Sequence, residues 1–174
     1  MVSVFVILIS TSCEHKDLCY DHSHTSRIHV VFDWKNVPDA TPETMRLYLF
    51  PIDGSKPQTY EFTDYRGGFV NVPAGRYKAL CVNSDTESVL YRNIGSFDGF
   101  EAYAPDGVLS VRSSLVPRAE GTSGERVAKS PDRLYSGRLD NVTIEVSTKD
   151  QMIILYPELS VCRYRVRIMN VSNL

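Results

Sequence analysis

Apolar and polar residues alternate along most of this chain, and the alternation first becomes regular at Ile28, Val30, Phe32 and Trp34. Successive side chains of a β-strand point to opposite faces, so an apolar period of two indicates a half-buried strand. Further strand patterns follow at intervals of about ten residues, over 45–50, 58–63, 69–72, 77–82, 141–147, 151–156 and 161–169. No window shows the apolar period of an amphipathic helix. The pattern predicts an all-β protein with an antiparallel β-sandwich over residues 27–148, whose inward residues include Ile28, Val30, Phe32, Trp34, Leu47 and Leu49.

Turn residues separate the strand patterns. Asp53-Gly54 lies between two of them and is a strong hairpin signal, because glycine adopts the positive φ that tight hairpin turns require. Pro73-Ala74-Gly75 predicts a second tight turn. Residues 104–137 are rich in Pro, Gly, Ser and Arg, so we expect a long loop there, with a short strand near 108–111.

The N-terminus has the features of an export signal. An apolar run over residues 2–9 leads through small residues to Cys13, as in the signals of bacterial lipoproteins, and it is too short to span a bilayer, which takes about 20 apolar residues. No lysine or arginine precedes the run, and Ser10 stands where such signals usually carry leucine. We expect residues 1–12 to be a lipoprotein signal peptide, Cys13 to carry the lipid, and residues 13–26 to be a polar tether. The alternative is a buried N-terminal strand with an ordinary cysteine.

The last strand pattern has no evident partner. Tyr164, Val166 and Ile168 alternate with arginines, and the sequence then stops at Leu174. The backbone groups of a strand need hydrogen-bond partners. Either this strand pairs back into the first sandwich, or it belongs to another domain. We expect residues 149–174 to be the start of a truncated second β domain.

Several stretches carry a family resemblance: CEHKDLCYDHSH at 13–24, FDW at 32–34, VPAGRY at 72–77, SPDRLY at 130–135 and YRVRIMNVSNL at 164–174. Together they resemble a family of Bacteroides lipoproteins of unknown function. That family is similar to the fimbrillin superfamily, especially the minor subunits that anchor fimbriae in the outer membrane. The PAGxY turn also occurs in many transthyretin-like sandwiches. The resemblance implies a transthyretin-like, Greek-key β-sandwich, and it covers the family's first domain and the first strand of its second.

The same resemblance implies a non-enzymatic lipoprotein of the outer membrane and cell surface, which serves as a fimbrial anchor, minor subunit or adhesin. Its partners would be the membrane, through the lipid on Cys13, and fimbrial subunits, through β-strand addition. In that mode an open sheet edge accepts an extended strand from a neighbour. Two alternatives stay open, namely a surface carbohydrate-binding lipoprotein and an inactive truncated fragment.

The net charge and the positions of the histidines decide which partners and which kinds of catalysis we expect. The formal net charge is −2 and no basic run is present, so nucleic acid is not an expected partner. All four histidines fall within the first 29 residues, and no Gly-x-Ser-x-Gly elbow occurs. A Ser-His-Asp or Cys-His enzyme is therefore disfavoured, and no cofactor is expected.

One cysteine and two histidines near the N-terminus are candidate metal ligands. Cys19, His22 and His24 could form a soft metal cluster, because thiolate and imidazole ligands suit zinc or copper. Their spacing matches no standard site, a solvated polar leader is the simpler interpretation, and we expect no metal.

Cys81 and Cys162 lie inside apolar strand patterns, which predicts buried free thiols.

Aromatic residues gather around the predicted loops and strand ends. An exposed aromatic platform on a sandwich suits sugar binding, although core packing is the commoner fate of such residues. The candidate ligand aromatics are Tyr60, Tyr65, Tyr91, Phe97 and Tyr103.

Overall fold

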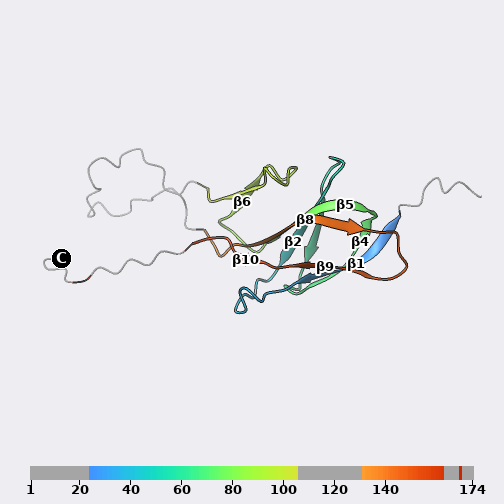
Figure 1. The fold of residues 1–174 in the computed structure, drawn as a ribbon. Helices are drawn as coiled ribbons and strands as arrows, with labels where there is room; N and C mark the ends of the chain where they lie inside the picture. The colour runs from blue at the N-terminus through green and yellow to red at the C-terminus, as the bar shows by residue number, and fades with distance from the viewer. Residues whose placement is uncertain (1–23, 106–130, 163–168, 170–174) are drawn as a thin grey trace, which may run out of the picture.

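The computed structural model describes residues 24–105, 131–162 and 169 of the 174-residue chain (Figure 1). Within these residues the regular structure is all β, as the sequence predicts, and no helix of the length and hydropathy of a membrane span is found. The strands are β1 (Thr25–Phe32), β2 (Met45–Pro51), β3 (Gln58–Phe62), β4 (Gly67–Pro73), β5 (Gly75–Asn83), β6 (Leu90–Arg92), β7 (Glu101–Tyr103), β8 (Tyr135–Ile144), β9 (Gln151–Leu155) and β10 (Glu158–Leu159).

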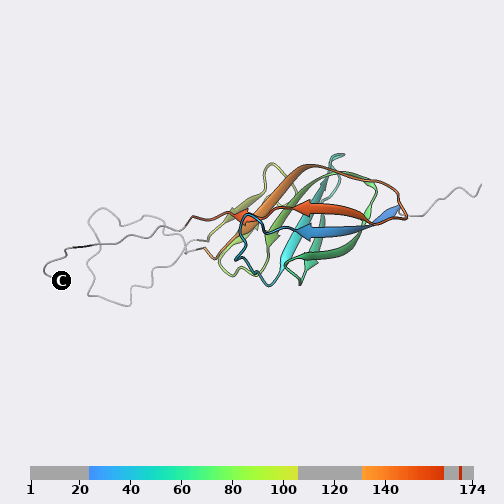
Figure 2. The ribbon, with the colours of Figure 1, turned by 60° about the horizontal axis from the view of Figure 1, so that its bottom comes forward.

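Two sheets face each other across one core (Figure 2). One has the strand order β4-β1-β9 and the other has the order β10-β8-β5-β2-β3, while β6 and β7 form a separate two-stranded ribbon. The predicted Asp53-Gly54 turn joins the antiparallel strands β2 and β3. Gly54 adopts a φ of 81°, and its N–H donates to the carbonyl of Pro51 over 3.2 Å.

Strand β9 lies beside β1 and runs parallel to it, which departs from the expected all-antiparallel arrangement. Phe32 is paired with Leu155, and the N–H of Asp33 donates to the carbonyl of Leu155 over 2.8 Å. Strand β10 adds to the other sheet by pairing with the first two residues of β8. Residues of β9 and β10, which we expected to begin a second domain, thus pair with the same two sheets as the strands before residue 149, and the domain boundary stays a prediction. The rest of that expectation concerns residues 163–168 and 170–174, which lie outside the described part.

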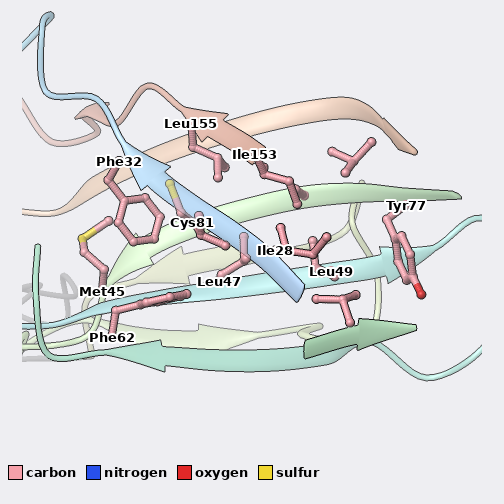
Figure 3. Close-up of a cluster of buried hydrophobic side chains, with 14 of the residues drawn as sticks. Ile28, Phe32, Met45, Leu47, Leu49, Phe62, Tyr77, Cys81, Ile153 and Leu155 are labelled. Carbon is pink, nitrogen blue, oxygen red and sulfur yellow. The ribbon is translucent and has the colours of Figure 1, made fainter. Parts of the chain in front are cut away.

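The core lies between the two sheets (Figure 3). The residues predicted to point inward are confirmed as buried members of it: Ile28, Val30, Phe32, Trp34, Leu47 and Leu49. Burial of each such side chain contributes about 1.5–3 kcal/mol to folding. Trp34 packs edge-on against Tyr135, with 5.3 Å between ring centroids, and its indole N–H donates to the carbonyl of Tyr65 over 2.8 Å.

The five-stranded sheet is covered on both faces. Its outer face carries Tyr48 and Phe50 from β2 and Leu80 and Val82 from β5. Side chains of the segment 84–105, which contains β6 and β7, pack on these four residues. Runs of consecutive apolar residues in β2 and β5 are the sequence signal of burial on two faces, a signal that period-two reasoning overlooks.

Three other expectations have different outcomes. Strand β8 starts at Tyr135 inside the stretch expected to be loop, because Ser136, Gly137 and Arg138 pair in regular register with β5. Cys81 is a buried free thiol, as predicted, whereas Cys162 is exposed and follows β10, the last strand among the described residues. The short strand expected near 108–111 falls outside the described residues.

Candidate functional site

Most of the proposed leader sites fall outside the described part of the chain. Cys13, Cys19 and His22 precede residue 24, so the lipid attachment and the metal cluster stay predictions. His24 is exposed, and its carbonyl accepts a hydrogen bond from the N–H of Ala74 over 2.7 Å. Within residues 24–105, 131–162 and 169, no group of three histidine, cysteine or acidic residues could hold a metal ion.

Two of the candidate aromatics, Tyr60 and Tyr65, are half-buried and pack against the core between the sheets. The Tyr60 hydroxyl lies 2.6 Å from Oε1 of Gln58 and 3.1 Å from the carbonyl of Asn71, and burial raises its pKa. The Tyr65 ring lies beside Trp34, with 6.3 Å between centroids. These two rings therefore contribute to packing at the side of the sandwich where β3 meets β4.

The other three candidates gather on the outer face of the five-stranded sheet. Phe97 is only 6% exposed and packs edge-on against Phe50, with 5.6 Å between centroids. The Tyr91 hydroxyl donates to the carbonyl of Asn83 over 3.1 Å, and burial raises the pKa of Tyr91. Tyr103 is 38% exposed. The structure thus divides the five aromatics into two groups, and Tyr103 of the second group lines a cavity.

That cavity, which we call the outer hollow, has a volume of about 350 Å³. Its apolar floor is formed by Leu80, Val82 and Leu134, which belong to the second hydrophobic cluster. Its walls come from β7, from β8 and from the residues that follow β10. They include Ala102, Tyr103, Ala104, Ser136, Arg138, Ser160 and Val161. Sequence reasoning singled out Tyr103 but missed the hollow, because its walls are far apart in sequence.

A buried amide holds the floor of the outer hollow in place. The Asn83 side chain is 3% exposed; it accepts the N–H of Tyr135 over 2.7 Å and donates to the carbonyl of Arg133 over 3.0 Å. Leu134 lies between these two partners and is 6% exposed. The end of β5 and the start of β8 are therefore fixed together, and this link positions Leu134.

Arg138 supplies the positive charge of the outer hollow. Its guanidinium donates to the carbonyl of Phe97 and lies over the Phe97 ring, 4.3 Å from the centroid. Such a cation–π contact with a buried ring restrains the head group while leaving it charged. The ion pairs found among the described residues use Arg27, Arg46, Lys78 and Arg92, and none includes Arg138.

Strand β7 lines the outer hollow through Ala102 and Tyr103. It pairs with β6 on one side through Tyr91 and Ala102, and in the described part of the chain no strand pairs with its other side. All three of its residues are exposed. An open strand edge of this kind offers unpaired N–H and C=O groups as a template for another strand. In Figures 1 and 2 the ribbon lies at the same end of the sandwich as β10.

This chain is similar in sequence and in fold to proteins of Bacteroides ovatus. A Bacteroides ovatus protein named as a candidate fimbrium anchoring subunit, Fim4B, is 32% identical over 148 residues, which are 84% of this chain and 41% of the relative. A solved structure of a candidate adhesin from Bacteroides ovatus has a TM-score of 0.64 and 29% identity, covering 86% of this chain and 49% of that one. This chain therefore spans less than half the length of either protein.

A second solved structure shares the fold at lower identity. It is described as a candidate polysaccharide-binding protein of Bacteroides thetaiotaomicron, and it has a TM-score of 0.50 and 15% identity over 76% of this chain and 46% of that one. The model of one family, the domain of unknown function DUF5119, matches residues 12–174. Because that match takes in almost the whole sequence, the chain belongs to the DUF5119 family.

Proposed function

We propose that this protein is a non-enzymatic lipoprotein of the cell surface that serves as a fimbrial anchor or minor subunit and binds its partner by β-strand addition. The observation that carries the proposal is the 32% identity, over 84% of this chain, with a protein named as a candidate fimbrium anchoring subunit. The finer fold assignment, a transthyretin-like Greek-key sandwich, belongs to the same proposal.

The direction of the chain supports an anchoring role. Strand β1 begins at Thr25, close behind the proposed lipid site at Cys13 and its polar tether. Because β9 runs parallel to β1, the chain leaves the sheet at the end opposite to the one where it entered (Figure 1). The outer hollow includes Ser160 and Val161 and so lies toward that far end. A lipid on Cys13 would hold the entry end at the outer membrane and leave the hollow facing outward.

The test uses a Bacteroides host that assembles fimbriae with this protein as its sole anchor. Replacement of Cys13 by serine removes the site of lipid attachment, and stable membrane binding requires more than one acyl chain. We expect the Cys13→Ser strain to release intact fimbriae into the medium, measured as fimbrial subunit in culture supernatant against cell-bound subunit. The matched control is Cys162→Ser, which changes an exposed cysteine far from the N-terminus and should leave fimbriae attached.

Two results would contradict the proposal. Fimbriae that stay cell-bound in a strain lacking the whole protein would exclude an anchoring role. Binding of purified protein to surface glycans on an array, together with normal fimbriae in the deletion strain, would favour a carbohydrate-binding role instead.

A further inference from the structure

We propose that the outer hollow binds an extended peptide segment of a partner protein that carries an apolar side chain and a carboxylate two residues apart. The inference rests on the proposed function, because it names the chemistry of the strand that a fimbrial partner would supply. Three features of the hollow specify three features of that peptide: the floor selects an apolar side chain, the edge of β7 selects extended backbone, and Arg138 selects a carboxylate.

The floor offers an apolar surface without a polar group to satisfy. Leu80, Val82 and Leu134 are at most 6% exposed and belong to one packed cluster. The described residues close the hollow only in part, so an aliphatic side chain of a ligand can reach this floor. Removal of that side chain from water would supply the main favourable free energy of binding.

The edge of β7 offers backbone partners at the rim of the same cavity. Ala102 and Ala104 line the hollow, and their small side chains let another backbone approach closely. An isolated two-stranded ribbon has only marginal stability in water, whereas three strands are more stable. An incoming strand would turn the β6–β7 ribbon into such a three-stranded sheet. Glu101, the acidic residue of β7, is paired with Arg92 and so does not repel an acidic ligand strongly.

Arg138 makes the site selective for an acidic strand. Its guanidinium has a carbonyl and an aromatic ring as partners but no carboxylate among the described residues. A carboxylate placed beside it would form a charge-assisted hydrogen bond. Since side chains two residues apart share one face of a strand, the apolar residue and the acidic residue of the ligand should be separated by a single residue.

The probe is a fluorescently labelled, acetylated and amidated heptapeptide, TTLTETT, whose leucine and glutamate share one face. Its affinity for the full 174-residue chain is measured by fluorescence anisotropy and compared with that of the neutral peptide TTLTQTT. We expect the acidic peptide to bind about fivefold more tightly, the size of one favourable, partly exposed ion pair. Arg138→Gln should remove this difference. The matched control is Arg76→Gln, which removes an exposed arginine of β5 outside the hollow and should preserve it.

Backbone pairing is tested separately with N-methylated peptides. Successive N–H groups of a strand point to opposite edges, so N-methyl groups at alternate residues block one edge only. We prepare TTLTETT methylated at the odd positions and at the even positions. One of the two should keep its affinity and the other should lose at least tenfold, because only one edge meets β7.

Equal affinity of the acidic and neutral peptides, or of the two N-methylated peptides, would overturn the proposal. So would tighter binding of a peptide with the sequence of residues 163–174, because the occupant would then be the chain's own terminus. Fimbriae released by the Cys13→Ser strain together with no peptide binding would overturn this inference and leave the proposed function standing. Peptide binding together with fimbriae retained in the deletion strain would overturn the proposed anchoring function and leave the peptide-binding inference standing.

Discussion

Ser88 and Asp132 hold each other through a reciprocal pair of hydrogen bonds. The N–H of Asp132 donates to Oγ of Ser88 over 2.9 Å, and the N–H of Ser88 donates to Oδ2 of Asp132 over 2.8 Å. The same carboxylate oxygen also accepts the N–H of Glu87 over 2.8 Å. This arrangement joins the start of the outer segment 84–105 to the chain that leads into β8, so it stabilises the cover of the five-stranded sheet.

We therefore expect Asp132→Ala to lower the free energy of unfolding by about 2 kcal/mol, because two backbone N–H groups lose a charged acceptor. Urea denaturation followed by tryptophan fluorescence measures the change. The control is Asp98→Ala, which removes an 81% exposed carboxylate that pairs with Lys78 and should cost less than about 1 kcal/mol. Equal costs for the two variants would show that the Ser88–Asp132 link does not support the fold.

Two glycines with positive φ should respond differently to substitution. Gly67 has a φ of 113°, and a Cβ there would lie 2.0 Å from the carbonyl oxygen of Val30 in β1. Gly67→Ala must push β1 and β4 apart, so we expect a loss of about 3 kcal/mol or more in unfolding free energy. Gly54 has a φ of 81° with no atom within 4 Å of the added Cβ, so Gly54→Ala should cost only about 1–2 kcal/mol. Similar costs would mean that the contact with Val30 relaxes freely.

The buried thiol of Cys81 should make stability depend on alkaline pH. Burial raises the pKa of Cys81 from its ordinary value of 9.0 to about 12. Above pH 9 the unfolded chain releases this proton while the folded chain keeps it, so ionisation favours unfolding. The free energy of unfolding should fall by about 1.4 kcal/mol per pH unit between pH 9 and pH 12, and the full contribution is present below pH 9.

Tyrosines titrate in the same range, so the measurement compares the protein with Cys81→Ala at pH 8, 9, 10 and 11. We expect the variant to show the shallower decline above pH 9. Parallel stability curves across the whole range would show that Cys81 ionises as readily in the folded state as in the unfolded state.

Truncation should locate the end of the first domain. A chain that ends at Cys162 keeps β9 and β10 and should unfold cooperatively near the midpoint of the full chain. A chain that ends at Lys149 loses Ile153 and Leu155, which are 6% and 0% exposed, and leaves one side of β1 unpaired. We expect this shorter chain to be unfolded by circular dichroism. A folded chain ending at Lys149 would restore the domain boundary that the sequence pattern suggests.

Local features of the sequence determined the strands and turns that depend on few residues. The alternation from Ile28 to Phe32 specifies a strand with one buried face, since side-chain direction follows from backbone geometry alone. The Asp53-Gly54 pair specifies a hairpin because the left-handed φ at Gly54 is a property of the residue itself. The inward faces of β1 and β2 were predictable because the direction of successive side chains follows from the geometry of the strand.

The tertiary structure decided which distant segments meet. The parallel pairing of β1 with β9 joins residues more than a hundred positions apart, and no local pattern encodes a partner at that distance. The outer hollow likewise combines Ala102, Leu134, Arg138 and Val161, whose proximity depends on the packing of a second layer over β5 and β8. Sequence periodicity reports how one segment exposes its own faces, whereas register and layer packing depend on interactions between segments, and the candidate site consists of such interactions.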